Sequence, residues 1–177
     1  MITLVSSTNR PDNFTNKIAY LNKEILKEEG VDSQILELEN LPSDFLISDM
    51  YGKRSENVEK IISRYIEGIN FFIFIVPEYN GSFPGILKLF IDGLNPELLH
   101  FKKAGLIGLS AGHNGNVRGL DHLSSIFHYL NMTVIPEMPK ISSISENLDE
   151  NGNITNKKMI EGLRKHARVV SRHINEK

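Results

Sequence analysis

The chain has 177 residues, of which 20 are Lys or Arg and 22 are Asp or Glu, so its formal net charge at pH 7 is −2. With 40% hydrophobic residues, this composition predicts one globular domain, Met1 to Lys177, without the basic surplus that nucleic-acid binding requires. The sequence has no cysteine, which excludes disulfides, a thiolate nucleophile and Cys-based metal sites and favours the reducing cytoplasm.

No segment predicts secretion or membrane insertion. The N-terminus runs from Met1 directly into a strand-like segment, with no basic or apolar leader region. The longest apolar run, Ile69 to Val76, is too short to cross a bilayer. We therefore expect neither a membrane nor nucleic acid as a partner.

Short apolar runs alternate with longer amphipathic stretches along the first half of the chain. A strand is predicted at Ile2 to Ser6, followed by a helix whose apolar residues recur from Ile18 to Gly30. A more polar strand at Ser33 to Leu38 is predicted to lie at a sheet edge. The clearest helical periodicity runs from Val58 to Ile69.

The second half of the chain repeats this alternation. Unbroken apolar runs at Asn70 to Val76 and Ala104 to Ser110 are typical of parallel strands covered on both faces. The other predicted elements are a helix at Pro84 to Leu94, a helix at Leu120 to Leu130, a short strand at Met132 to Ile135 and a helix at Ile160 to Ile174. The pattern predicts an α/β fold in three layers, with a five-stranded parallel sheet between helices. In such sheets ligands bind at the carboxyl ends of the strands, so the loops after the first, third and fourth strands are the candidate site.

The first of these loops, residues 6–15, is rich in hydroxyl and amide side chains and opens a helix. Thr8, Arg10, Asn13 and Thr15 could hold a phosphate monoester together with main-chain N–H groups, because a helix N-terminus favours an anion. An ordinary capped loop is the alternative. Asp12 places a carboxylate nearby, which must point outward or pair with Arg10.

The second loop follows the strand that ends at Val76. Pro77 restricts the backbone, Asn80 and Gly81 predict a tight turn, and Tyr79 supplies a flat face against which a planar heteroaromatic ring could lie. A turn before a capped helix explains the same residues. Neither the dinucleotide fingerprint G-x-G-x-x-G nor a P-loop motif follows any strand, so any phosphate loop here is of another kind.

The third loop allows a competing interpretation. Gly108 to Gly112 matches the nucleophile pattern G-x-S-x-G, and Asp149 and His166 follow in the order that a serine esterase using Ser110 would need. Such an enzyme requires a helix directly after the serine, whereas the glycines here predict a loop. The six histidines lack metal-ligand spacing, so we predict no metal and expect most of them to be surface or capping side chains. The role of His113, on the loop itself, stays open.

The second loop also resembles a known family. Residues 77–88, which read Pro-Glu-Tyr-Asn-Gly-Ser-Phe-Pro-Gly-Ile-Leu-Lys, and the later Ile91-Asp92 closely resemble the signature of NAD(P)H-dependent FMN reductases, a flavodoxin-like group that includes quinone, azo-dye and chromate reductases. The third loop, with Gly115 and Arg118-Gly119, is also similar. The first loop is looser, since Ser7 stands where the family usually has Gly. The resemblance covers roughly residues 2–139.

The resemblance implies a flavodoxin-like sheet with strand order 2-1-3-4-5, FMN as cofactor and NAD(P)H as co-substrate. The residues that it assigns to FMN are Ser7, Thr8, Arg10, Asn13 and Thr15 around the phosphate; Pro77, Glu78, Tyr79, Asn80 and Gly81 beside the isoalloxazine; and Ser110, Ala111 and Gly112 at its other edge.

The implied reaction passes hydride from NAD(P)H to FMN and then electrons to a flavin, a quinone or another small acceptor by ping-pong kinetics, with no catalytic residue required of the protein. The resemblance also implies a homodimer or tetramer, with the helix at Phe83 to Leu94 near the contact. An electron-carrier flavodoxin-like protein is a further alternative, although such carriers are strongly acidic and this chain carries only −2.

Overall fold

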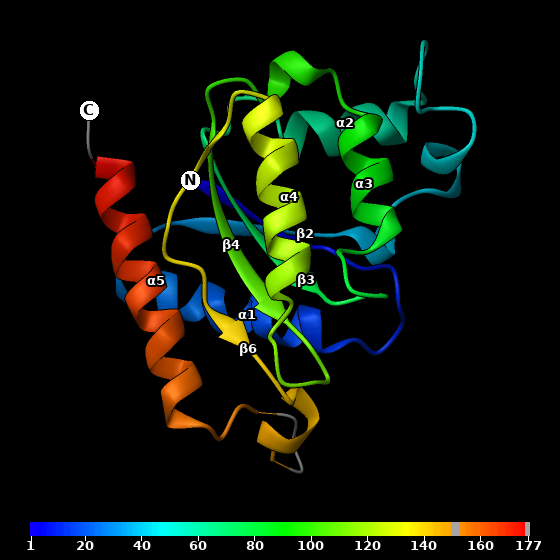
Figure 1. Cartoon of the computed structure of the whole chain (residues 1–177). Coiled ribbons are helices and arrows are strands. Elements are labelled where there is room, and N and C mark those ends of the chain that lie inside the picture. The colour runs from blue at the N-terminus through cyan, green and yellow to red at the C-terminus, as the bar shows by residue number, and fades with distance from the viewer. Residues whose placement is uncertain (150–152, 176–177) are drawn as a thin grey trace.

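A six-stranded parallel sheet forms the middle layer of the computed structural model, which describes residues 1–149 and 153–175 (Figure 1). The main path of the sheet is β2-β1-β3-β4-β5, and β6 pairs separately with β4. The strands are β1 (Ile2–Ser6), β2 (Ser33–Glu37), β3 (Phe71–Pro77), β4 (Lys103–Leu109), β5 (Thr133–Val134) and β6 (Lys140–Ile141). The predicted strand order and the edge position of the second strand are therefore confirmed.

Five α-helices cover the two faces of this sheet. They are α1 (Phe14–Glu28), α2 (Glu56–Tyr65), α3 (Gly85–Asp92), α4 (Val117–Tyr129) and α5 (Lys157–Asn175). Short 3₁₀ segments lie at Leu38–Asn40 (η1), Ser43–Leu46 (η2), Pro96–Leu98 (η3) and Ile144–Asn147 (η4). No helix within residues 1–149 and 153–175 is long and apolar enough to cross a membrane.

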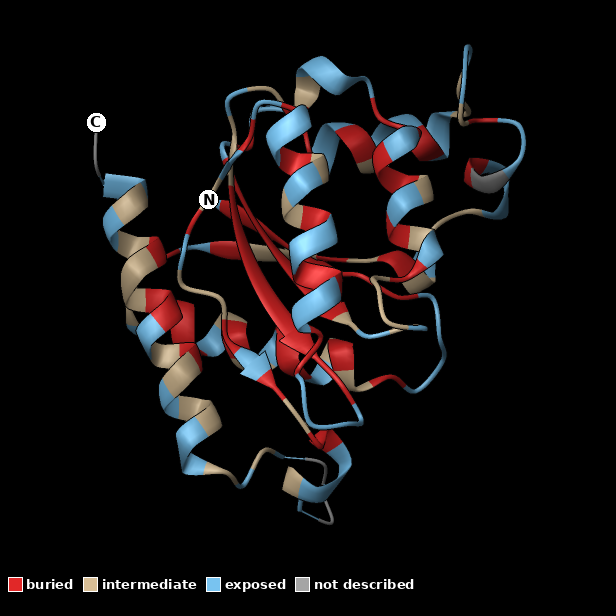
Figure 2. Ribbon diagram, viewed as in Figure 1, coloured by how far each residue is buried: buried red, intermediate tan, exposed pale blue. Residues whose placement is uncertain are grey.

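Two hydrophobic cores follow from the alternation of side chains along the strands. Phe72 and Phe74 point to one face, where α2, α3 and α4 cover them, and the ring of Phe74 lies 4.6 Å from that of Phe127 between centroids. Ile73 and Ile75 point to the other face, beneath α1 and α5. The central strands β1, β3 and β4 are buried along almost their whole length (Figure 2). This burial on both faces explains why the central strands read as unbroken apolar runs.

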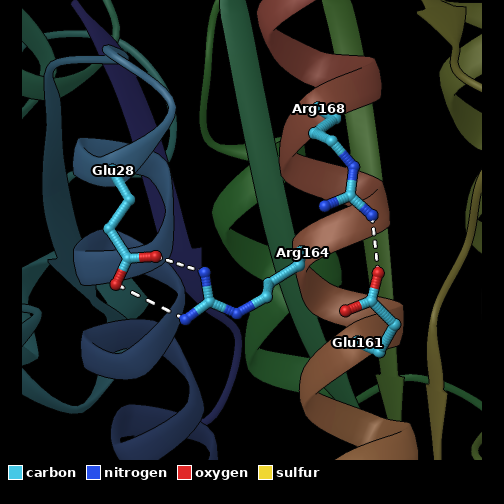
Figure 3. Close-up of polar contacts among 4 residues, drawn as sticks. All are labelled: Glu28, Glu161, Arg164 and Arg168. Atoms are coloured by element: carbon cyan, nitrogen blue, oxygen red, sulfur yellow. Dashed lines mark hydrogen bonds and ion pairs between the residues drawn. The ribbon is translucent and has the colours of Figure 1, made fainter.

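The packing of α5 against α1 closes the second core. An ion pair joins Arg164 of α5 to Glu28 of α1, and Arg168 pairs with Glu161 along α5 itself, 2.6 Å between Nη2 and Oε1 (Figure 3). These side chains are exposed, so their contribution to stability is small. The apolar face of α5 supplies the adhesion, because Leu163, Ala167 and Val170 are fully buried.

The largest differences from the sequence prediction are one helix end and one additional strand. The helix predicted to reach Ile69 ends at Tyr65, because the backbone N–H groups of Ile66 and Glu67 both turn back to the carbonyl of Ile62; Ile66 and Ile69 nevertheless remain buried beyond the helix. The strand β6 was not predicted at all. It pairs Gly108 and Leu109 of β4 with Lys140 and Ile141, directly after a proline-containing segment that reads as a loop.

His166 of α5 is an exception to the expectation that most histidines are surface or capping side chains. Its side chain is fully buried against the sheet, where its Nε2 lies 2.8 Å from the point that a β-carbon on Gly105 would occupy. Neither ring nitrogen has a hydrogen-bond partner among residues 1–149 and 153–175. Burial lowers the pKa of His166 from 6.5 to about 4, since a charged imidazole would lose its hydration there.

The free energy of unfolding is therefore predicted to fall as the pH drops from 6.5 towards 4. In this range the unfolded chain binds a proton on His166, whereas the native chain does not. Linkage gives a loss of about 2 kcal/mol between pH 7 and pH 5 from this residue. Urea unfolding at the two pH values measures it. His166→Leu should remove this component of the pH dependence, whereas His128→Leu, at an exposed position of α4, should leave it intact. An unchanged slope in His166→Leu would contradict the assignment.

Candidate functional site

The three candidate loops meet at the carboxyl ends of β1, β3 and β4. They enclose a cavity of about 410 Å³, lined by Arg10, Pro11, Asp12, Asn13, Phe14, Thr15, Pro77, Glu78, Tyr79, Leu109, Ser110, Ala111, Ile144 and Ser145. The loops converge because parallel pairing places these strand ends at one edge of the sheet. Of the predicted site residues, Ser7, Thr8, Asn80, Gly81 and Gly112 are not in this lining.

The first loop leaves β1 with its hydroxyl groups turned inward. Ser7 is fully buried and donates its hydroxyl to the carbonyl of Val5, 3.1 Å away, while its backbone N–H bonds to Ile75 of β3. Thr8 is almost fully buried, and its Oγ1 lies 2.6 Å from the hydroxyl of Tyr79 in the second loop. Thr8 therefore links the two loops instead of presenting a free hydroxyl to the cavity.

The N-terminus of α1 forms one end of the cavity. Asn13 caps the helix by accepting from the N–H of Asn16, 2.8 Å from Oδ1, and its side-chain NH₂ donates to the carbonyl of Arg10 at 2.7 Å. The N–H groups of Phe14 and Thr15 belong to the first turn and have no intrahelical partner. The helix dipole adds partial positive charge at this point. These amides, rather than the side chain of Asn13, are free to bind an anion.

Charged side chains at this end favour the same chemistry. Arg10 is exposed at the cavity and forms no ion pair with any residue that the structure describes. Asp12 is exposed, adopts a positive φ of 52° and does not pair with Arg10 within that same part of the chain. The guanidinium of Arg10 is thus available to a ligand, and the carboxylate of Asp12 is exposed to solvent.

The second loop folds as the sequence predicts. Tyr79 and Ser82 exchange two backbone hydrogen bonds, of 2.9 and 3.0 Å, around Asn80 and Gly81. Both central residues have positive φ, 52° and 77°, which Asn and Gly tolerate well. The backbone N–H of Glu78 bonds to the carbonyl of Leu109 at 2.8 Å and so fixes this loop to β4.

The geometry of the third loop does not favour a serine esterase. The hydroxyl of Ser110 donates to the carbonyl of Gly112 at 2.7 Å and accepts from the N–H of Gly115 at 2.9 Å. The next helix begins only at Val117, and His166 lies against Gly105, far along β4 from Ser110. Ser110 therefore shapes the loop. The exposed His113 lies beside Ser143, 3.4 Å from Nδ1 to Oγ, outside the cavity lining.

Two parts of the site were not predicted from the sequence. Ile144 and Ser145 of η4 line the cavity because β6 brings the chain back beside β4, and the N–H of Ile144 bonds to the carbonyl of Ser110 at 3.2 Å. No periodic pattern marks this segment. Its only sequence signal is the short apolar Ile141 after Pro139, which in hindsight indicates a strand resuming after an interruption.

Asn116 is the second unpredicted residue, and it joins the second and third loops. It is fully buried with a positive φ of 62°, donates from Nδ2 to the carbonyl of Val76 at 2.9 Å, and accepts from the N–H of Gly119 at 3.1 Å. One side chain therefore caps α4 and fixes the end of β3. The Asn-x-x-Gly spacing before an apolar helix was the available signal.

A parallel sheet of order 2-1-3-4-5 with helices on both faces defines a flavodoxin-like α/β fold. The model of the NADPH-dependent FMN reductase family matches residues 1–145, so the chain belongs to this family. It is an FMN-dependent NAD(P)H oxidoreductase.

Two similar proteins agree with this assignment, and a solved structure shares the fold. A 2-hydroxy-1,4-benzoquinone reductase from a Burkholderia species is 26% identical over 86% of this chain and 84% of its own length. An NAD(P)H-dependent FMN reductase from Schizosaccharomyces pombe is 28% identical over 63% of this chain, and the match spans about half, 48%, of that protein. The structure of the flavoenzyme NAD(P)H:(acceptor) oxidoreductase FerB from Paracoccus denitrificans has the same fold, with a TM-score of 0.77 and 24% identity over 97% of this chain and 94% of that one.

Loss of the Asn116 side chain is predicted to destabilise the whole site. Asn116→Ala removes the side-chain donor to the carbonyl of Val76, removes the cap and places alanine at a positive φ, for a combined loss of about 2–4 kcal/mol in the free energy of unfolding. Asn116→Gly should lose less, since glycine tolerates this φ. Asn114→Ala, at an exposed position of the same loop, is the matched control and should be near neutral in denaturant unfolding.

Proposed function

We propose that the cavity holds FMN with its phosphate at the N-terminus of α1 and its isoalloxazine between the second and third loops. The observation that carries this proposal is the convergence of all three loops on one cavity, whose anion-favouring end and aromatic end lie on different loops. Arg10, the hydroxyl of Thr15 and the amides of Phe14 and Thr15 are the phosphate donors.

The remaining predicted residues would shape this seat. Tyr79 and Glu78 line it on one side, and Ser110 and Ala111 on the other. Thr8 acts through its hydrogen bond to Tyr79, and Asn80 and Gly81 act through the turn that presents Tyr79. Ser7 and Gly112 support the first and third loops from outside the lining.

Bound FMN supplies the redox chemistry, accepting hydride from NAD(P)H and passing electrons to a second substrate. The protein binds and orients the flavin and needs no acid–base pair of its own. Because the aromatic end of the cavity opens to solvent through exposed loops, nicotinamide and acceptor can occupy the same face in turn, which gives ping-pong kinetics. The quinone reductase relative supports a small quinone as acceptor, beside a free flavin.

We further propose a homodimer or tetramer in the cytoplasm, with α3 near the contact. A second hollow, of about 750 Å³, lies between α3, α4 and the loop at residues 50–54. Tyr51 and Tyr129 at this hollow are 75% and 87% exposed, which is unusual for large apolar side chains and supports contact with another copy.

The reductase is tested by the visible spectrum of the purified chain after FMN is supplied, followed by anaerobic addition of NADH or NADPH. We expect flavin absorbance that bleaches rapidly with at least one of the two nucleotides. An electron carrier would bind FMN but bleach slowly. A colourless protein with esterase activity that Ser110→Ala abolishes would overturn the proposal.

Arg10→Ala is predicted to weaken FMN binding by about 1.5–3 kcal/mol, the scale of a charge-assisted hydrogen bond to phosphate. Quenching of flavin fluorescence measures the dissociation constant. Riboflavin, which lacks the phosphate, should bind wild type and variant alike. Arg168→Ala, whose guanidinium pairs with Glu161 on α5, is the control and should leave both affinities unchanged. An unaltered FMN affinity in Arg10→Ala would falsify the phosphate assignment.

A further inference from the structure

A carboxylate lies directly behind the proposed phosphate loop. Glu39 belongs to η1, which follows the edge strand β2, and its Oε2 accepts from the side-chain NH₂ groups of Asn13 and Asn16, each at 3.1 Å. Asn16 in turn accepts from the hydroxyl of the fully buried Ser6 at the end of β1. The carboxyl end of β2 therefore reaches the site as well, although its loop does not line the cavity.

This position is unfavourable on charge alone. Asn13 lines the cavity, so the carboxylate of Glu39 lies one side chain behind the surface that would meet a phosphate dianion. Two like charges this close repel each other through a protein surface. A carboxylate that only carried charge would weaken binding of FMN, and its presence calls for a compensating effect.

The hydrogen bonds supply that effect. Asparagine side chains readily bond to nearby backbone N–H groups. Asn13 and Asn16 lie beside the N–H groups of Phe14 and Thr15, so unrestrained asparagine side chains would compete with a phosphate for these groups. Glu39 holds both side-chain NH₂ groups on its own side of the helix. The side-chain NH₂ of Asn13 also donates to the carbonyl of Arg10, so the side chain that Glu39 holds also fixes the backbone of Arg10, the cation of the proposed phosphate seat.

We infer that Glu39 is a positioning residue for phosphate recognition, acting through Asn13 and Asn16. This inference rests on the proposed function. Its net effect on FMN binding is favourable, because order in the first turn of α1 and at Arg10 outweighs the repulsion of one partly shielded carboxylate. The effect is confined to the phosphate, since the side-chain hydrogen bonds of Glu39 go to Asn13 and Asn16 of the first loop and α1, and none goes to the second or third loop.

The test compares the dissociation constants of FMN and riboflavin by fluorescence quenching in the full chain. Glu39→Ala should weaken FMN binding about tenfold, the scale of one hydrogen bond to a charged group, and leave riboflavin within about twofold of wild type. Glu39→Gln, whose amide oxygen can still accept from both asparagines, should recover most of the loss. Glu37→Ala, which removes a neighbouring carboxylate that accepts from Tyr20 and Asn40, is the matched control and should change neither value.

The outcomes separate the inference from the proposed function. FMN affinity equal to or tighter than wild type in Glu39→Ala, an equal loss for both flavins, or no recovery in Glu39→Gln would each overturn the positioning role. If Glu39→Ala does not fold by circular dichroism, Asn16→Ala, which removes one arm of the network and keeps the carboxylate, carries the same FMN-selective prediction. A wild-type chain that binds neither flavin would overturn the proposed function itself.

Discussion

Parallel pairing of β3 with β1 on one side and β4 on the other is the constraint on which the site depends. The register is continuous from Phe71 to Pro77 against β4, so all three strands end at the same edge. Backbone hydrogen bonds then extend the alignment into the loops, from Ser7 to Ile75 and from Glu78 to Leu109. Residues separated by about a hundred positions in sequence meet in one cavity for this reason, and the side-chain bonds of Thr8 to Tyr79 and of Asn116 to Val76 then hold the loops together.

The proposed phosphate end of the cavity depends more on main-chain groups than on the polar side chains of the first loop. The hydroxyls of Ser7 and Thr8 and the amide of Asn13 are all committed to other protein atoms, which leaves helix amides, Thr15 and Arg10 for a ligand. Such an arrangement is rigid before a ligand arrives, and rigidity lowers the entropy lost on binding. It also accounts for Ser7 in a position where a glycine is usual, because its side chain folds back onto β1 away from the cavity.

The spacing of apolar residues was sufficient to predict the helices, the long strands and the three loops, because burial on one or both faces of an element produces a regular pattern of apolar residues in the sequence. They could not reveal contacts that exist only between distant elements. Glu39 and Asn116 read as ordinary polar loop residues until η1 meets α1 and α4 meets β3. His166 was mispredicted for the opposite reason: this polar residue lies on the buried face of α5, over Gly105, a strand position that has no side chain to exclude it. Strand β6 was not predicted because prolines precede it, and for the same reason Ile144 and Ser145 were not recognised as lining the cavity.

Two short strands, β5 and β6, share the last position of the sheet beside β4, and this arrangement affects the tendency of the protein to aggregate. Each of these strands is two residues long, and Pro136 and Pro139 lie between them. An outer strand with a long row of unsatisfied N–H and C=O groups can template the addition of strands from other chains. Here the outer edge consists of two short strands, and the prolines between them have no N–H donor. The same segment that brings η4 to the cavity therefore also disfavours strand addition at this edge of the sheet.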